Sequence, residues 1–176
     1  MKIFFVFFAL FISLSVSAPI PAGLWSEEVE LATRNKHMAQ AVAIALRIRK
    51  AFRPKPHESV FWSGTKPEKN GQMVSVMGDA KKFALAHNKK ILTQALSRHG
   101  IRIPAPQGNP LSSRLWNFAS KAWALKAMGV VHAVLGSKRR PGNVYDNIEK
   151  PTLLKNGKVS KLIEHNAATG EEATVK

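Results

Sequence analysis

The feature that most constrains the fold is the apolar run over residues 130–135, in which His132 is the one polar side chain. Gly129 and Gly136 bound the run. Its length and its β-branched valines favour a buried strand, and strands buried on both faces are typical of parallel sheets. Several helical segments precede this strand. We therefore expect an α/β fold in which an N-terminal helical lobe packs on a small, mostly parallel sheet lobe, with a cleft between them.

The helical spacing of apolar residues, together with capping and helix-breaking residues, defines the segments around this strand. Ser26 is a candidate N-cap for a helix that runs to residue 52, where a Pro-rich stretch ends it. Residues 159–163 could form a further strand or a short helix. The other expected helices are residues 79–87, 91–100 and 112–128, the last capped by Ser112 or Ser113. The expected organisation is a linker over 19–25, a domain over 26–165 and a flexible tail over 166–176; the helical lobe covers about 26–128 and the sheet lobe about 129–165.

The first 18 residues have the pattern of a secretory signal peptide. Lys2 supplies the positive start, residues 3–12 are apolar, and residues 16–18 end in small side chains where signal peptidase cleaves. Ten strongly apolar residues are too few to cross about 30 Å of hydrocarbon. We therefore expect a secreted, extracellular mature chain without a transmembrane segment.

Charge and cysteine content narrow the classes of partner. The 27 Lys and Arg residues outnumber the 11 Asp and Glu residues, which gives a formal net charge of +16. Such a charge attracts polyanions, anionic surfaces or a small anionic substrate. The cations are scattered apart from Lys138, Arg139 and Arg140, and they do not alternate with aromatic residues, so we expect no dedicated nucleic-acid recognition. The chain has no Cys, which excludes a disulfide scaffold, a thiolate metal site and a Cys nucleophile.

Short motifs for common chemistries are missing from the sequence. The 6 His residues are widely separated, and there is no H-E-x-x-H pair, P-loop, G-x-G-x-x-G loop or G-x-S-x-G elbow. We therefore predict no metal site and no bound cofactor. His132 is interpreted as a core histidine that bonds to a neighbour.

A longer pattern is more specific. Trp116 is followed four residues later by Ser120, then by the apolar run with Gly136 and Ser137, and then by Glu149; Phe61-Trp62-Ser63 lies upstream. This order resembles the ADP-ribosyl cyclase / cyclic-ADP-ribose hydrolase family, whose members cleave the nicotinamide–ribose bond of NAD. The resemblance spans roughly residues 59–165 and would make the chain a divergent, disulfide-free, secreted member.

The resemblance implies roles for five residues. Glu149 matches the catalytic Glu, whose carboxylate would stabilise an oxocarbenium-like ribose or trap it covalently. Trp62 and Trp116 match the tryptophans that hold the nicotinamide ring, and Ser120 matches a Ser that hydrogen-bonds substrate phosphate or the reacting ribose. Ser63 belongs to the upstream substrate-binding element. NAD or a related dinucleotide would be the substrate, with no further cofactor, and Trp123 is assigned to the core.

Three departures from the family keep two functions open. The family's T-L-E-D element appears as Ile91-Leu92-Thr93-Gln94, and the Arg after the first W-S is Gly64, for which Lys66 is a candidate substitute. The family's disulfides are absent. One function is an NAD glycohydrolase, with cyclase activity as a further outcome. The alternative is a catalytically silent, secreted basic protein that binds anionic surfaces through residues 138–140 and the basic helix end at 47–55.

Overall fold

The structure is a computed structural model that describes the backbone of residues 22–176 and the side chains of residues 30–176. The predicted signal peptide over residues 1–18 and the start of the predicted linker lie outside the described residues. The described residues fall into two units, 22–35 and 36–176, and all features below belong to the second unit unless stated. No helix in the described part is both long and apolar enough to cross a membrane.

The first helix, α1, extends from Ala22 to Ala51 and passes from the first unit into the second. The predicted linker over 19–25 is therefore wrong for residues 22–25, which are helical. The predicted cap at Ser26 placed the helix start too late, because residues 22–25 contain no proline and the single Gly23 does not end the helix.

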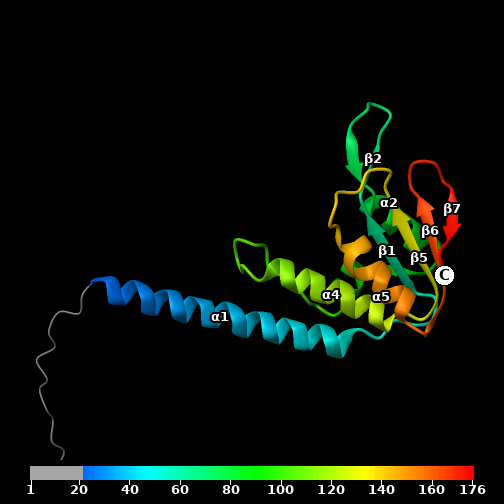
Figure 1. Ribbon diagram of the computed structural model, residues 1–176. Helices are drawn as coiled ribbons and strands as arrows, with labels where there is room; N and C mark the ends of the chain where they lie inside the picture. Colours follow the sequence, from blue (N-terminus) through cyan, green and yellow to red (C-terminus); the bar gives the residue numbers. More distant parts are fainter. Residues whose placement is uncertain (1–21) are drawn as a thin grey trace, which may run out of the picture. The chain divides into compact units, whose positions relative to one another are not determined.

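The predicted α/β fold with a mostly parallel sheet is confirmed. Five strands form one sheet in the order β4-β1-β5-β6-β7, in which only β7 runs antiparallel to its neighbour; β1, β5 and β6 lie side by side in Figure 1. The elements after α1 are β1 (Ser59–Ser63), β2 (Thr65–Pro67), β3 (Met73–Ser75), α2 (Met77–Ala86), β4 (Lys90–Ile91), α3 (Leu92–Arg98), α4 (Ser112–Lys126), β5 (Gly129–Leu135), the π-helix η1 (Tyr145–Glu149), α5 (Lys150–Lys155), β6 (Val159–Asn166) and β7 (Glu172–Thr174).

Two expected boundaries need correction. The sheet is not confined to residues 129–165, since β1 and β4 precede that range; with five and two residues, these strands are too short to show a clear period. The tail over 166–176 was expected to be flexible, but Glu172–Thr174 forms β7 along β6. Its polar composition suggested disorder, whereas pairing with β6 satisfies its backbone groups. Neither Ser112 nor Ser113 is the N-cap of α4, because the helix begins at Ser112 and its N-cap position is Leu111; the Ser112 hydroxyl donates instead to the carbonyl of Pro104 at 2.6 Å.

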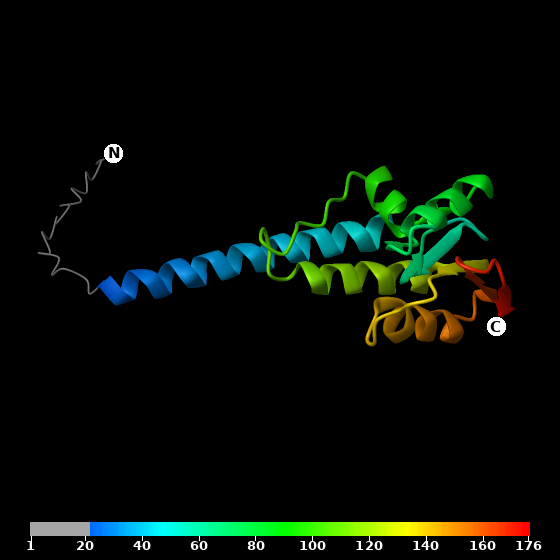
Figure 2. The ribbon, with the colours of Figure 1, turned by 90° about the horizontal axis from the view of Figure 1, so that it is seen from above.

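The two faces of β5 meet different helices. Val131, Ala133 and Leu135 belong to a core shared with the second half of α1 and with α3, α4 and α5. Val134 points the other way and packs with Ala80 and Ala84 of α2. Seen from above, α4 and α5 run beside each other along the first face (Figure 2). The helices on this first face form one wall of the site described below.

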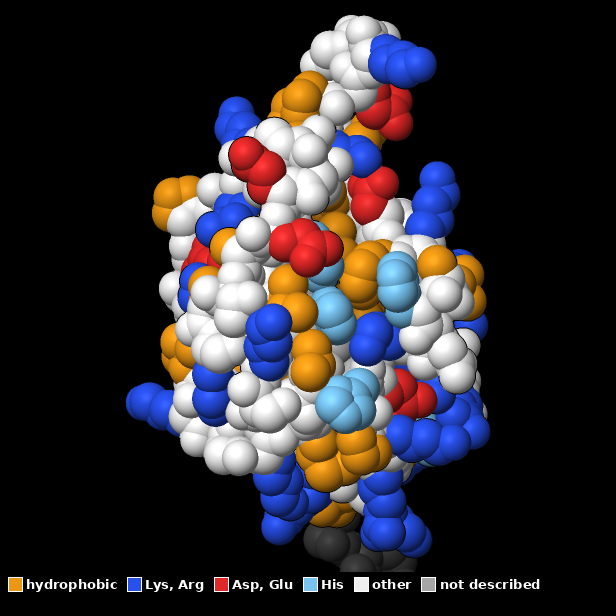
Figure 3. Space-filling view, turned by 90° about the vertical axis from the view of Figure 1, so that its right-hand side faces the viewer, with side chains coloured by type: hydrophobic (Ala, Val, Ile, Leu, Met, Phe, Trp, Pro, Cys, Tyr) orange, Lys and Arg blue, Asp and Glu red, His pale blue; other side chains and the backbone are white. Residues whose placement is uncertain are grey.

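His132 lies on the α2 face of the sheet and is bonded to a neighbour, as predicted, although it is only half-buried. Its Nδ1 is 2.8 Å from Nε2 of His165, and both rings pack against Phe83. Burial lowers the pKa of His132 to about 4. Several histidine side chains gather on this face (Figure 3). Among the described residues, no group of three or more His, Asp or Glu side chains could hold a metal ion.

Candidate active site

A cavity of about 860 Å³ opens where β1 and β5 end. The end of β1, the start of α3, one side of α4, η1 and the loop after β5 line it. The carboxyl ends of parallel strands are where α/β sheets usually place ligands. All five residues predicted from the family resemblance line this one cavity: Trp62, Ser63, Trp116, Ser120 and Glu149.

Glu149 is the buried acid of this cavity. Its side chain is only 6% exposed and it is the last residue of the π-helix η1. Burial raises the pKa of Glu149 from 4.5 to about 7, while a hydrogen bond from the Ser120 hydroxyl acts in the opposite direction. A π-helix changes the direction of side chains relative to an α-helix and is frequent at functional sites. The result is a carboxyl group that changes charge near neutral pH inside a cavity.

Glu149 is the only carboxylate among the described residues that line the cavity. Thr93 lines the wall where the family resemblance would place an acid. Gln94 does not line it; its side-chain oxygen accepts a hydrogen bond from the Ile91 backbone N–H at 3.0 Å at the start of α3. Any positive charge that develops in the cavity therefore meets one carboxylate and not two.

The two predicted tryptophans of the site differ in burial from the tryptophan of the core. Trp116 is 37% exposed, and Trp62 is half-buried. Trp123 is 2% exposed and meets Phe52 edge-on with ring centroids 5.3 Å apart, as expected for a core residue. Trp62 and Trp116 thus keep part of their indole surface free for contact with a ligand, since both line the cavity.

A hydrogen-bond chain fixes the loop that follows β5. The Ser63 hydroxyl donates to Oδ1 of Asn143 at 3.0 Å, and Nδ2 of Asn143 donates to Asp146 at 2.7 Å. Asp146 also pairs with Arg139 at 3.1 Å. Because Ser63 and Asn143 are both buried, this chain holds the basic loop against the end of β1.

The cluster Lys138, Arg139 and Arg140 lines the cavity that contains Glu149. The sequence pointed to this cluster only as a surface for anions. Lys66, the candidate substitute for the missing Arg, does not line the cavity and instead pairs with Asp79 at 2.8 Å. The structure therefore gives the cavity three cations that come from the loop after β5.

Gly64 occupies its position for a steric reason. Its φ is +93°, and a Cβ there would lie 2.7 Å from the Lys138 carbonyl oxygen. The space at Gly136 is smaller still, because a Cβ there would clash with the Thr65 carbonyl oxygen. The crossing of β1 and the loop after β5 thus requires small residues, and the Arg that the family resemblance would place at residue 64 does not fit this backbone.

Sequence reasoning missed Asn143 and Tyr145 of the cavity wall. Tyr145 is 1% exposed, and its hydroxyl donates to Glu164 at 2.7 Å, so it anchors the start of η1 to β6. The signal that could have found Tyr145 is its spacing, because it stands about one helical turn before Glu149. Asn143 carries no comparable signal, since its role depends on contact with Ser63 across 80 residues.

Comparisons with known proteins were made at three levels. No protein-family model matches the chain, and no curated protein matches it in sequence. Two similar solved structures are ADP-ribosyl cyclases. One is ADP ribosyl cyclase complexed with N1-cIDPR, with 18% identity over 68% of this chain and 53% of that chain and a TM-score of 0.47. The other is Aplysia cyclase complexed with substrate NGD and product cGDPR, with 20% identity over 66% and 52% and a TM-score of 0.42. The aligned region covers about half the length of each of these two structures.

Proposed function

We propose that the cavity is the active site of an enzyme that cleaves the nicotinamide–ribose bond of NAD. The observation that carries the proposal is the buried carboxyl of Glu149, which shares one cavity with two part-exposed tryptophans and three cations. We further propose that the chain acts outside the cell after removal of residues 1–18, and that it needs no cofactor besides its substrate.

The chemistry requires one negative charge next to the anomeric carbon. As the C1′–N bond breaks, its electron pair leaves with nicotinamide, which becomes neutral, and positive charge develops on the ribose. The carboxylate of Glu149 stabilises that charge in a water-poor environment, where electrostatic interactions are strong. Water then adds to C1′ and releases a proton, which completes hydrolysis. The ionised form of Glu149 is the active one in this scheme.

The other side chains account for binding. The faces of Trp62 and Trp116 attract the cationic pyridinium more strongly than the neutral nicotinamide that leaves. Lys138 and Arg140 supply charge for the diphosphate, since neither forms an ion pair among the described residues, whereas Arg139 is paired with Asp146. Thr93 leaves the opposite wall without a charge, so we propose that water captures the ribose cation more often than an internal nucleophile does and that hydrolysis exceeds cyclisation.

The test is product analysis with the mature protein. Incubation with NAD followed by chromatography should show nicotinamide in an amount equal to the sum of ADP-ribose and cyclic ADP-ribose, with cyclic ADP-ribose as the minor of the two. A Glu149→Gln protein, purified by the same procedure, serves as the control for contaminating activity. Nicotinamide release no faster than in buffer would reject the enzyme. A heparin-bound protein without NAD cleavage would favour the silent binding protein instead.

A further inference from the structure

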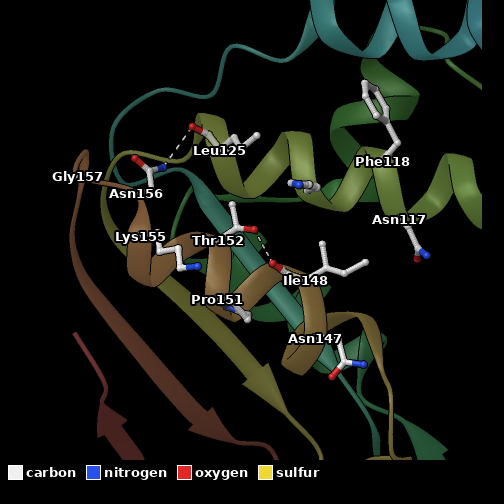
Figure 4. A pocket seen from close by; sticks show the side chains of 11 residues that line it. Asn117, Phe118, Leu125, Asn147, Ile148, Pro151, Thr152, Lys155, Asn156 and Gly157 are labelled. Atoms are coloured by element: carbon white, nitrogen blue, oxygen red, sulfur yellow. Dashed lines mark hydrogen bonds between the residues drawn. The ribbon is translucent and has the colours of Figure 1, made fainter.

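A second hollow of about 700 Å³ lies outside the active-site cavity, between α4 on one side and η1 and α5 on the other. Figure 4 shows α4 and α5 as its two walls, with Leu125 at one end and Asn147 at the other. It is a groove between two helices. None of its lining residues lines the active-site cavity.

Apolar side chains are left uncovered along this groove. Leu125 is 53% exposed and Phe118 is 39% exposed, and both lie on α4. Ile148 and Pro151 contribute from η1 and the start of α5, where both are half-buried. Their exposure leaves apolar surface along the groove free for contact with a partner.

Hydrogen bonds join the elements that form the walls of the groove. Nδ2 of Asn156 donates to the carbonyl groups of Ala124, Leu125 and Ala127 at 3.0, 3.2 and 2.9 Å, so the amide that closes one end of the groove also caps α4. The Thr152 hydroxyl donates to the Ile148 carbonyl at 2.6 Å and joins α5 to η1. A preformed groove binds a partner without the cost of ordering its own walls.

The charge of the groove decides what can occupy it. Its ionisable lining residues are Lys121 and Lys155, no acid lines it, and neither lysine forms an ion pair among the described residues. A second copy of this chain is a poor occupant, because two chains of net charge +16 repel each other. An acidic partner is attracted by the lysines and by the whole field of the protein.

We propose that this groove binds an acidic amphipathic helix of a partner protein. The geometry matches the recognition mode in which a helix places apolar residues at i, i+3, i+4 and i+7 into a groove between two helices. Leu125, Ile148 and Pro151 meet the apolar stripe, and Lys121 and Lys155 meet carboxylates on its flanks. The inference stands apart from the proposed NAD chemistry, since it uses no residue of the active-site cavity.

The test uses a defined probe and the whole mature protein. A fluorescein-labelled helical peptide of about 15 residues carries leucines on one face and glutamates on the flanks. Anisotropy is measured at about 0.15 M salt, where surface charges beyond about 8 Å are screened. We expect a Kd on the order of 10 µM. The same peptide with lysines in place of glutamates, and a shuffled peptide of the same composition, should bind at least about tenfold more weakly.

Two variants locate the binding. Leu125→Ser should weaken binding of the glutamate peptide about tenfold, and so should the double charge reversal Lys121→Glu with Lys155→Glu. Lys81→Glu with Lys82→Glu makes the same change in net charge at exposed positions of α2, outside the groove, and should change the Kd less than about threefold. All these side chains are exposed, so each variant should fold, which circular dichroism checks.

The peptide experiments would overturn the proposal in any of three ways: no binding of the glutamate peptide up to about 1 mM, equal binding of the shuffled peptide, or equal loss in the Lys81 and Lys82 control. Sedimentation of the protein alone tests whether a second copy of the chain occupies the groove. A dimer that Leu125→Ser dissociates would assign the groove to a second copy and would also overturn the acidic partner.

Discussion

Ser120, on α4, and Glu149, at the end of η1, line the same cavity, and hydrogen bonding from the Ser120 hydroxyl lowers the pKa of the Glu149 carboxyl. Both side chains are more than nine-tenths buried, with exposures of 6% each. A hydrogen bond to a buried carboxylate favours its charged form, so Ser120 lowers the pKa of Glu149 while burial raises it. The pair therefore sets the pH range in which the cavity carries a negative charge.

Ser120→Ala should shift the activity profile of the enzyme toward higher pH. The variant removes the hydrogen bond that favours ionised Glu149, and such bonds to charged groups are worth about 1.5–3 kcal/mol. The rate of NAD cleavage below pH 7 should fall more than the rate at pH 10, where most of Glu149 is ionised in both proteins. The rates are measured as kcat against pH. A uniform loss at every pH would show that Ser120 acts on the substrate and not through Glu149.

Glu149→Gln should stabilise the folded protein at alkaline pH. The folded pKa of Glu149 is about 7, above its value of 4.5 when exposed, so the folded state holds the proton more tightly than the unfolded state. The wild type loses stability as the pH rises from 4.5 to 7, by up to about 3 kcal/mol, and Gln removes that loss. Urea unfolding should show the variant more stable at pH 8 and equal to the wild type at pH 4. A difference independent of pH would contradict the buried carboxyl.

Lys138→Gln with Arg140→Gln should weaken binding of NAD without changing the chemical step. Both residues line the cavity and neither is in an ion pair among the described residues, so their charge is available to the diphosphate. KM should rise about tenfold at low salt, with kcat unchanged, and the difference should shrink in high salt. Lys158→Gln with Lys161→Gln, at two exposed positions outside the cavity, is the control matched in charge. A fall in kcat alone would contradict this role.

Gly64→Ala should destabilise the protein more than Gly71→Ala. Both glycines have positive φ, +93° and +78°, but a Cβ at residue 64 meets the Lys138 carbonyl at 2.7 Å while nothing lies within 4 Å of one at residue 71. The backbone strain costs about 1–2 kcal/mol in each case, and the close contact adds to it only at residue 64. Equal losses in urea unfolding would show that the crossing near Lys138 relaxes freely.

The sequence predicted those parts of the fold that have strong local signals. The glycine-bounded run at residues 130–135 became β5, and the segments around residues 79–87 and 112–128 became α2 and α4. The strands β1 and β4 were not predicted because each is short and is stabilised by parallel pairing with distant residues, such as Val60 with His132. Local periodicity carries no information on such pairing.

The candidate site was predicted in part, and only through the family resemblance. The register of Trp62, Ser63, Trp116, Ser120 and Glu149 named residues that line one cavity. Sequence spacing could not place Lys138 and Arg140 beside them, because the loop reaches the cavity through the contact between Ser63 and Asn143. Lys66 was the candidate to replace the family's Arg, but its charge is neutralised by Asp79, a pairing that no sequence motif indicates.

The most direct test of the account is the rate of nicotinamide release from NAD by Glu149→Gln at pH 8, compared with the wild type. Gln keeps the size and the hydrogen-bonding capacity of Glu149 but removes the charge that opposes the ribose cation. The account predicts a kcat lower by about two to three orders of magnitude, in a protein that unfolds at least as cooperatively as the wild type. A folded Glu149→Gln protein that releases nicotinamide at the wild-type rate would contradict it.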